Sequence, residues 1–369
     1  MSRTVAVLVV LCGLLLAGVL LTRGEPEHMA RVDTTRPTSS PSATATIVPG
    51  ASGPTAAPVS STHLDGDPYA DLAAQLHARG VEVWFEIDLV ARWLAGPASF
   101  QEGLDRMHAL AGVPGVQGFK VADELGYDDG IDSPEQAAAF LRAVRAGMAA
   151  TVGRRVQVLV DVVVPDLGCL GWQDGGSPNP EAATCARAAR VKHPAAVESA
   201  VTSYLRQGLV DRLDLSTSLL DEWTYQSWGL SQAEAQGRAW QHVKSLGWDR
   251  MTVLQSRKAL ADAGGYQGSP MQALHDVHTF VDIPVRSGAK AVDVWTWRQA
   301  YDGRTVSLLD DSLDPNPLWR QLEARHRDGV RLVTHITPSM LLPSAEQRSR
   351  EYNLYASVFD AAFVAAGSG

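Results

Sequence analysis

The stretch VEVWFEID at residues 81–88 decides the expected fold, because its apolar and polar positions alternate strictly. The odd-numbered positions form one wholly apolar face, and Glu82, Trp84, Glu86 and Asp88 form the other. In a barrel of parallel strands, the apolar face lies under the surrounding helices and the other face points to the barrel axis. Glu86 and Asp88 then fall at the carboxyl end of the strand, where barrels build their sites.

Six further strand-like runs begin near residues 116, 156, 210, 250, 290 and 330. Five of the six gaps between the seven runs are about 35 to 40 residues long, which leaves room for one loop and one helix after each strand. The pattern predicts an α/β fold, a (β/α)8 TIM-type barrel over residues 65–369. Because only seven strands are clear, we expect an incomplete barrel or an eighth strand elsewhere. Residues 278–283 are a weak candidate that fits better within a helix over 270–287, and residues 344–366 are expected to form a closing helix.

The N-terminal region has a different composition from the rest of the chain. Residues 4–22 carry no charge and are long enough to cross a bilayer. We expect residues 1–24 to be a transmembrane anchor or a cleaved signal segment, and residues 25–64, rich in Ser, Thr, Pro and Ala, to be a disordered linker. The folded domain is then extracytoplasmic, held at the cell membrane by a single pass or secreted if the segment is cleaved.

Charge and cysteine content limit the kinds of partner and site that we expect. The net charge of -9 argues against a nucleic-acid surface, which needs clustered Lys and Arg. Cys169 and Cys185 lie sixteen residues apart in the longest loop, and we expect them to form a disulfide, the alternative being two free thiols. Without histidines nearby they are a poor zinc site. We expect a monomer with no metal and no cofactor.

Charged side chains are expected to converge on the barrel axis. The alternation found at residues 81–88, applied to the later strands, directs many of them inward. Burying a carboxylate costs several kcal/mol of folding free energy unless it forms an ion pair, accepts hydrogen bonds or stays hydrated. A protein that keeps many buried carboxylates therefore has a use for them. Any one of them could instead cap a helix or pair with Lys120, Arg212 or Arg257. The inward-facing set consists of Glu86, Asp88, Lys120, Glu124, Asp161, Asp214, Asp293 and His335.

Tryptophans at strand ends and in the loops after strands favour a sugar ligand, because indoles stack on the apolar faces of sugar rings while hydroxyls bond to carboxylates and amides. Glycoside cleavage needs one acid and one base or nucleophile on opposite sides of the bond. The expected substrate-binding residues are Lys120, Asp123, Trp84, Trp172, Trp223, Gln255, Asp293, Trp295, Trp297 and His335.

On these residues the chain resembles bacterial extracytoplasmic glycoside-hydrolase-like (β/α) barrels, over about residues 65–366. The resemblance implies a hydrolase acting on a cell-surface or environmental polysaccharide. Glu124 with Asp161 or Asp214 is the expected acid and base pair. Glu86 and Asp88 would bind substrate or tune pKa values, and Glu222 is an outlying candidate. The chain departs from the common barrel signature, since the fourth strand run ends in LDLS at residues 213–216, without an Asn-Glu pair.

Three other interpretations stay open at this point. The barrel could bind glycans without cleaving them. It could be a metal-assisted enzyme with Glu86, Asp161, Asp214 and Asp293 as Mg²⁺ ligands, although no histidine cluster or phosphate loop accompanies them. Schiff-base chemistry at Lys120 is disfavoured, because neighbouring carboxylates would raise the pKa of the amine instead of lowering it.

Overall fold

The computed structural model describes residues 64–151, 156–172 and 180–365. The chain divides into a unit Met1–Ala56, which lies wholly outside the described residues, and a compact unit Ala57–Gly369. The expected anchor at 1–24 and nearly all of the expected linker at 25–64 therefore also lie outside them. In the part of the chain that is described, no helix is both long and apolar enough to span a bilayer.

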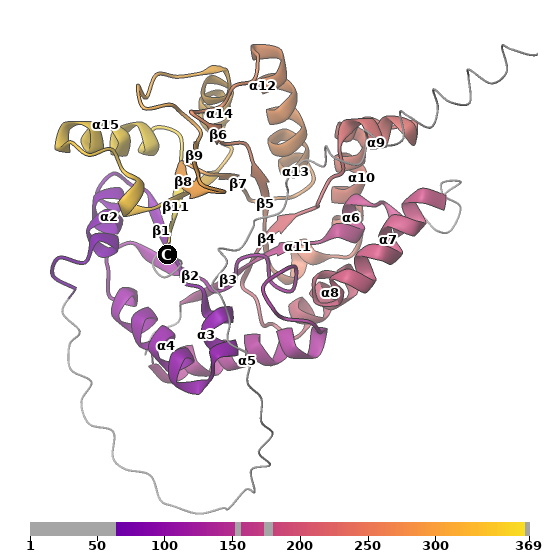
Figure 1. The fold of residues 1–369 in the computed structure, drawn as a ribbon, viewed down its shortest axis with the longest axis horizontal. Coiled ribbons are helices and arrows are strands. Elements are labelled where there is room, and N and C mark those ends of the chain that lie inside the picture. Colours follow the sequence, from indigo (N-terminus) through magenta and orange to yellow (C-terminus); the bar gives the residue numbers. More distant parts are fainter. Residues whose placement is uncertain (1–63, 152–155, 173–179, 366–369) are drawn as a thin grey trace, which may run out of the picture. The chain divides into compact units, whose positions relative to one another are not determined.

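Within the described residues, eight parallel strands form a closed barrel (Figure 1). The order around it is β11-β1-β2-β3-β4-β5-β7-β10, and pairing of β10 with β11 closes the ring. The predicted TIM-type fold is confirmed. The barrel strands are β1 (Glu82–Glu86), β2 (Val116–Lys120), β3 (Gln157–Val163), β4 (Arg212–Ser216), β5 (Val253–Ala259), β7 (Ala291–Trp295), β10 (Leu332–Ile336) and β11 (Ala361–Ala365).

The eighth strand is β11, and it corrects the expectation of a closing helix over residues 344–366. That helix ends at Ala356, and the chain then enters the barrel between β10 and β1. Residues 278–283 are not a strand, because α12 (Pro270–Val277) continues without a break into a π-helical turn (His278–Asp282) and α13 (Ile283–Arg286). An incomplete barrel is thus excluded.

Helices surround the barrel (Figure 1). Most begin at a side chain that caps the first turn: Ser231 and Glu234 form a capping box at α10, and Asn316 caps α14. The helices are α2 (Pro68–His77), α3 (Leu89–Ala95), α4 (Pro97–Ala111), α5 (Pro134–Thr151), α6 (Pro165–Gly168), α7 (Pro180–Lys192), α8 (Glu198–Arg206), α9 (Glu222–Ser227), α10 (Gln232–Ser245), α11 (Trp248–Met251), α12 (Pro270–Val277), α13 (Ile283–Arg286), α14 (Pro317–Arg327) and α15 (Ala345–Ala356).

Two apolar layers hold the barrel. The larger lies between strands and helices and contains the odd-numbered positions of β1, as the alternation predicts. A smaller cluster fills the barrel interior, where Gly118 leaves room for the ring of Trp84: a Cβ at Gly118 would lie 2.5 Å from it. This interior cluster consists of Trp84, Leu159, Ala291, Val333, Ala361 and Phe363.

Two residues further along four of these strands, toward their carboxyl ends, the interior layer is charged instead of apolar. Every second residue of a strand faces inward, so the charged layer lies next to the apolar interior cluster, on the side of the strands' carboxyl ends. Its members on these strands are Glu86, Asp161, Asp293 and His335.

A small antiparallel sheet extends the barrel at its carboxyl-end mouth. It consists of β6 (Asp262–Ala263), which follows β5, and the hairpin β8 (Arg298–Tyr301) and β9 (Arg304–Ser307), which follows β7. Arg298 pairs with Ile336 at the end of β10 and fixes the hairpin to the barrel. The loops after β5 and β7 are therefore structured in their own right.

Candidate active site

Lys120, at the end of β2, is the buried centre of the charged layer. Its side chain is 0% exposed, and its Nζ lies 2.9 Å from Asp123 Oδ1, 3.2 Å from Asp161 Oδ2 and 3.5 Å from Glu86 Oε2. Burial by itself would lower the pKa of Lys120, but the three carboxylates raise it well above its usual range. The amine stays protonated, which does not suit a Schiff-base nucleophile.

Arg257, on β5, joins the three carboxyl groups nearest to the mouth. Its Nη1 lies 2.6 Å from Asp161 Oδ2 and 3.0 Å from Glu124 Oε1, and its Nη2 lies 3.7 Å from Asp123 Oδ1. One nearly buried guanidinium thus contacts both Glu124 and Asp123. Arg257 and Lys120 share Asp161, which is itself completely buried.

His335, at β10, bridges the two carboxylates on the far side of Lys120. Its Nδ1 lies 3.0 Å from Glu86 Oε2, and its Nε2 lies 2.9 Å from Asp293 Oδ2. Burial would lower the pKa of His335, but Asp293 and Glu86 raise it to about 9. The pKa values of both carboxyl groups lie below their usual range, because the cations outweigh the effect of burial. At neutral pH this trio carries one positive and two negative charges.

Asp214, on β4, differs from the other carboxyl groups of the layer. Its side chain is completely buried, and neither carboxyl oxygen has a hydrogen-bond partner in the structure. Burial, with the charges of Asp293 and Asp161, raises its pKa well above the usual range. Gln255 lies beside it in register and accepts a 3.4 Å bond from Arg212 Nη1.

Three carboxyl groups near the mouth have pKa values that diverge. Burial raises the pKa of Asp123, but Lys120 and Arg257 outweigh it and hold the group ionised. The pKa of Glu124 stays above its usual value, because burial exceeds the opposing effect of Arg257. Burial raises the pKa of Asp161 to about 7 despite its two cationic neighbours. Divergent pKa values in adjacent carboxyl groups mark acid and base assignments.

The backbone at Glu124 is unusual. Its φ of 54° lies in the left-handed region, which is uncommon for a residue with a side chain. Bonds on both sides fix this turn, from Tyr127 N to Glu124 O at 2.9 Å and from Leu125 N to Asp161 O at 2.9 Å. Such a conformation persists only where the surroundings impose it, and it is concentrated at functional sites.

Two aromatic side chains contact each other where the β8–β9 hairpin follows β7. Trp295, at the end of β7, contacts Tyr301 of the hairpin edge to face, with ring centroids 5.5 Å apart. Burial, Asp302 and then Glu124 raise the pKa of Tyr301, so the hairpin lies within the electrostatic reach of Glu124. Trp84 instead lies in the apolar interior cluster below the charged layer.

Several other residues expected at the site lie elsewhere. Trp297 does not point inward: β7 ends at Trp295, and the Trp297 ring packs in the outer layer, 5.7 Å from Trp319. Asp88 does not face the axis, since its Oδ1 caps α3 with a 3.1 Å bond from Ala91 N.

Three outlying candidates are found in the helix layer. Glu222, in the first turn of α9, accepts a 2.8 Å bond from Gln232 N. Trp172 stacks on His242 with ring centroids 4.2 Å apart, and Trp223 is 69% exposed on α9. The structure brings none of these three into contact with the charged layer.

A cysteine pair and the absence of a metal cluster complete the description. Cys169 and Cys185 form the predicted disulfide. Among the described residues, no group of three or more His, Cys, Asp or Glu side chains is arranged to hold a metal ion. Of the carboxyl groups in the layer, Glu86, Asp161 and Asp293 form ion pairs with Lys120, Arg257 or His335.

Two site residues were missed or left unassigned at the sequence level. Arg257 follows the strand run at residues 251–256, whose alternation does not show which side chains face inward. Its position shortly after Gln255 nevertheless indicates that it lies near the mouth. Tyr301 belongs to a hairpin inside a loop, and the run RQAYDGRTVS at residues 298–307, with its Asp-Gly turn, carried that signal.

Comparison with known proteins gives structural matches only. No protein-family model matches the chain, and no curated protein matches it. A probable tagatose 6 phosphate kinase from Sinorhizobium meliloti is 17% identical with a TM-score of 0.43, over 78% of this chain and 64% of its own. A 2,3-dimethylmalate lyase is 11% identical with a TM-score of 0.35, over 80% of each chain. A putative phosphonomutase from Burkholderia cenocepacia is 13% identical with a TM-score of 0.38, over 81% of this chain and 93% of its own.

Identities and TM-scores this low give no information about the activity of this protein. The three proteins bear the names of a kinase, a lyase and a mutase, and none bears that of a glycoside hydrolase. Of the resemblance inferred from the sequence, the strand topology shows the barrel directly.

Proposed function

We propose that this protein is an extracytoplasmic glycoside hydrolase that cleaves a polysaccharide through Glu124 and Asp123. One observation carries the proposal: a carboxyl group with a raised pKa and an ionised carboxylate are held by the same guanidinium at the barrel mouth. Glycoside cleavage needs a proton donor for the leaving oxygen and an ionised partner for the anomeric carbon or the attacking water.

The two roles follow from exposure and charge. Glu124 is the general acid, because its pKa is raised and its side chain is 15% exposed, so it can give its proton to the glycosidic oxygen. Asp123 is the ionised partner, because Lys120 and Arg257 hold its charge and its side chain is 38% exposed. Both follow β2 on the loop at the mouth, and so a sugar can reach them.

This assignment moves the second role from Asp161 or Asp214 to Asp123. Asp161 and Asp214 are completely buried and cannot touch a substrate. Asp161 instead positions Lys120 and Arg257, which it contacts at 3.2 and 2.6 Å. Glu86, His335 and the other members of the charged layer act through Lys120 on the charge of Asp123.

The extracytoplasmic placement rests on the disulfide and the N-terminal composition. Disulfides form and persist in oxidising compartments and are rare in the cytosol. The Cys169–Cys185 bond closes a segment beside the mouth-side end of β3, where it restrains the loop after that strand. An apolar segment at residues 4–22 provides the route of export.

A hydrolysis screen tests the proposal. The full chain is incubated with plant, bacterial and fungal polysaccharides, and new reducing ends and retained polysaccharide are measured in the same samples. Glu124→Gln is expected to lose about 10²- to 10⁴-fold in rate while it keeps binding. Glu102→Gln, on the outer face of α4, is the matched control and should cleave normally. Binding by all three proteins without product contradicts the proposal and indicates a glycan-binding barrel.

A further inference from the structure

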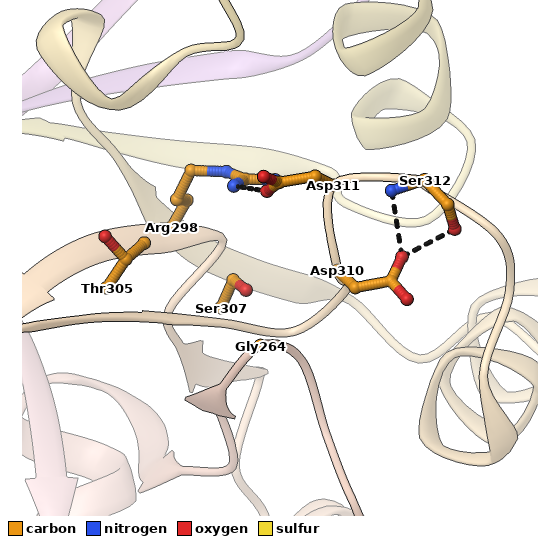
Figure 2. A pocket seen from close by; sticks show the side chains of 7 residues that line it. All are labelled: Gly264, Arg298, Thr305, Ser307, Asp310, Asp311 and Ser312. Atoms are coloured by element: carbon orange, nitrogen blue, oxygen red, sulfur yellow. Dashed lines mark hydrogen bonds and ion pairs between the residues drawn. The ribbon is translucent and has the colours of Figure 1, made fainter.

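A pocket lined by polar residues lies beside the mouth, between the β8–β9 hairpin and the loop after it. It has a volume of about 440 Å³, within the range of small-ligand sites. Figure 2 shows Arg298, Thr305 and Ser307 on the hairpin side and the loop at 310–312 opposite them. Its lining residues are Gly264, Arg298, Thr305, Ser307, Asp310, Asp311 and Ser312.

The loop that carries the acidic side of the pocket is fixed in place. Asp310 Oδ1 accepts bonds from Ser312 N at 3.0 Å and Ser312 Oγ at 2.6 Å (Figure 2). Gly265 has a φ of +90°, and a Cβ there would lie 2.6 Å from Asp310 N, so glycine lets the β6 turn contact this loop. The pocket is therefore largely formed before any ligand arrives.

The basic side of the pocket is a nearly buried arginine. Arg298 is 7% exposed and pairs with Asp311, whose own side chain is 79% exposed. The buried carboxylate of Glu351 lies 3.9 Å from Arg298 Nε, and that Nε has no hydrogen-bond partner in the structure. Arg298 is thus fixed in the pocket wall, because its Nη1 pairs with Asp311 and its buried Nε faces Glu351.

The lining chemistry selects a polyol. One arginine and two aspartates carry a formal charge of -1, which disfavours an anionic ligand, and every lining residue except Gly264 has a polar or charged side chain. Guanidinium donors and carboxylate acceptors stand side by side, with hydroxyl groups of Ser and Thr next to them. Neighbouring hydroxyls of a sugar ring donate and accept in this alternating way.

The hairpin connects this pocket to the acid pair. Arg298 and Tyr301 lie at opposite ends of β8, and Tyr301 contacts Trp295 within the electrostatic reach of Glu124. The strand β8 thus connects Arg298, which lines the pocket, to Tyr301, which contacts Trp295 at the end of β7.

We propose that the pocket is a remote sugar subsite, which binds a neutral sugar unit of the same chain that is cleaved at Glu124. The substrate is then a polymer or long oligomer of neutral sugars instead of a disaccharide or an acidic polysaccharide. This inference rests on the proposed function for the cleavage step, but the binding step can be tested separately.

The binding test uses Glu124→Gln as background, so that no probe is cut. Cellopentaose, maltopentaose, mannopentaose and xylopentaose are titrated by calorimetry, with tetragalacturonate as the acidic probe. Asp310→Asn keeps the side-chain shape but removes a charged acceptor. Asp314→Asn, an exposed residue of the next turn that pairs with Arg350, is the matched control.

At least one neutral pentasaccharide is expected to bind, and Asp310→Asn should weaken it about tenfold, whereas Asp314→Asn should not. The loss should be smaller for the matching trisaccharide. Tighter binding of tetragalacturonate, equal effects of the two variants, or no binding of any neutral probe would overturn the subsite.

Product formation by the wild-type chain separates the two claims. Pocket-dependent binding without any cleavage retains the subsite and contradicts the hydrolase. Cleavage that Asp310→Asn slows equally for trisaccharide and pentasaccharide retains the hydrolase and contradicts the subsite. If both claims hold, the loss of kcat/KM in Asp310→Asn grows with chain length.

Discussion

His335 Nε2 lies 2.9 Å from Asp293 Oδ2 inside the barrel, where both side chains are buried. Because the folded pKa of His335 is about 9 against an ordinary value of 6.5, the protonated imidazole stabilises the fold. That contribution is complete below about pH 6.5 and is lost as the pH rises through about 9.

The wild-type chain should therefore lose on the order of 3 kcal/mol of unfolding free energy between pH 6 and pH 10, relative to His335→Gln. Urea unfolding of both proteins at the two pH values measures the difference. Parallel pH dependence in wild type and variant would show that folding does not raise the pKa of His335.

Lys120→Met tests the buried centre of the layer. The methionine fills a similar volume but leaves Asp123, Asp161 and Glu86 without their shared cation. Removing one partner from a buried ionic cluster costs about 3 to 5 kcal/mol. Lys290→Met, an exposed lysine before β7, should change stability by less than about 0.5 kcal/mol. Equal stability of the two variants would mean that the cluster is not held by Lys120.

The alternation predicted much of this layer, because the helix-facing side of most of the strands is apolar and so identifies the side that faces in. It predicted the inward position of Glu86, Lys120, Asp161, Asp214 and His335. It failed at the strand ends, where the chain leaves the regular period. Asp88 caps a helix and Trp297 follows a turn away from the axis.

The eighth strand could not be read from periodicity. Residues 361–365 read AAFVA and are buried on both faces, so they show no alternation. Alanine favours helices, and a short apolar run beside a helical pattern fits either structure. The pairing of this run with β1 and β10 depends on contacts between segments far apart in the sequence. The ion pairs of Arg257 are likewise set by register between strands far apart in sequence.

Arg257→Gln tests the tuning of Glu124. Arg257 lowers the pKa of Glu124 against the effect of burial, so its removal should raise that pKa further. If Glu124 must be protonated, the alkaline limb of the pH profile of kcat/KM moves to higher pH, while the maximum falls. Arg320→Gln, on the exposed face of α14, should leave the profile unchanged. A limb that moves to lower pH contradicts the acid role.

The disulfide provides a test outside the site. A bond across a separation of 16 residues should contribute about 3 kcal/mol through the entropy of the unfolded chain. The double variant Cys169→Ala, Cys185→Ala is expected to unfold at correspondingly lower urea. Reductant should shift the wild-type transition to that of the double variant and leave the latter in place. An unchanged wild-type transition would show that the bond does not stabilise the fold.

The most direct test of Glu124 as the general acid compares two leaving groups, once the screen has identified the sugar. Wild type and Glu124→Gln are assayed on the natural oligosaccharide and on a 2,4-dinitrophenyl glycoside, whose leaving group departs without protonation. We predict that Glu124→Gln loses about 10²- to 10⁴-fold in kcat/KM on the oligosaccharide and far less on the activated glycoside. Equal losses on both substrates, or no loss on either, would contradict the assignment of Glu124 as the proton donor.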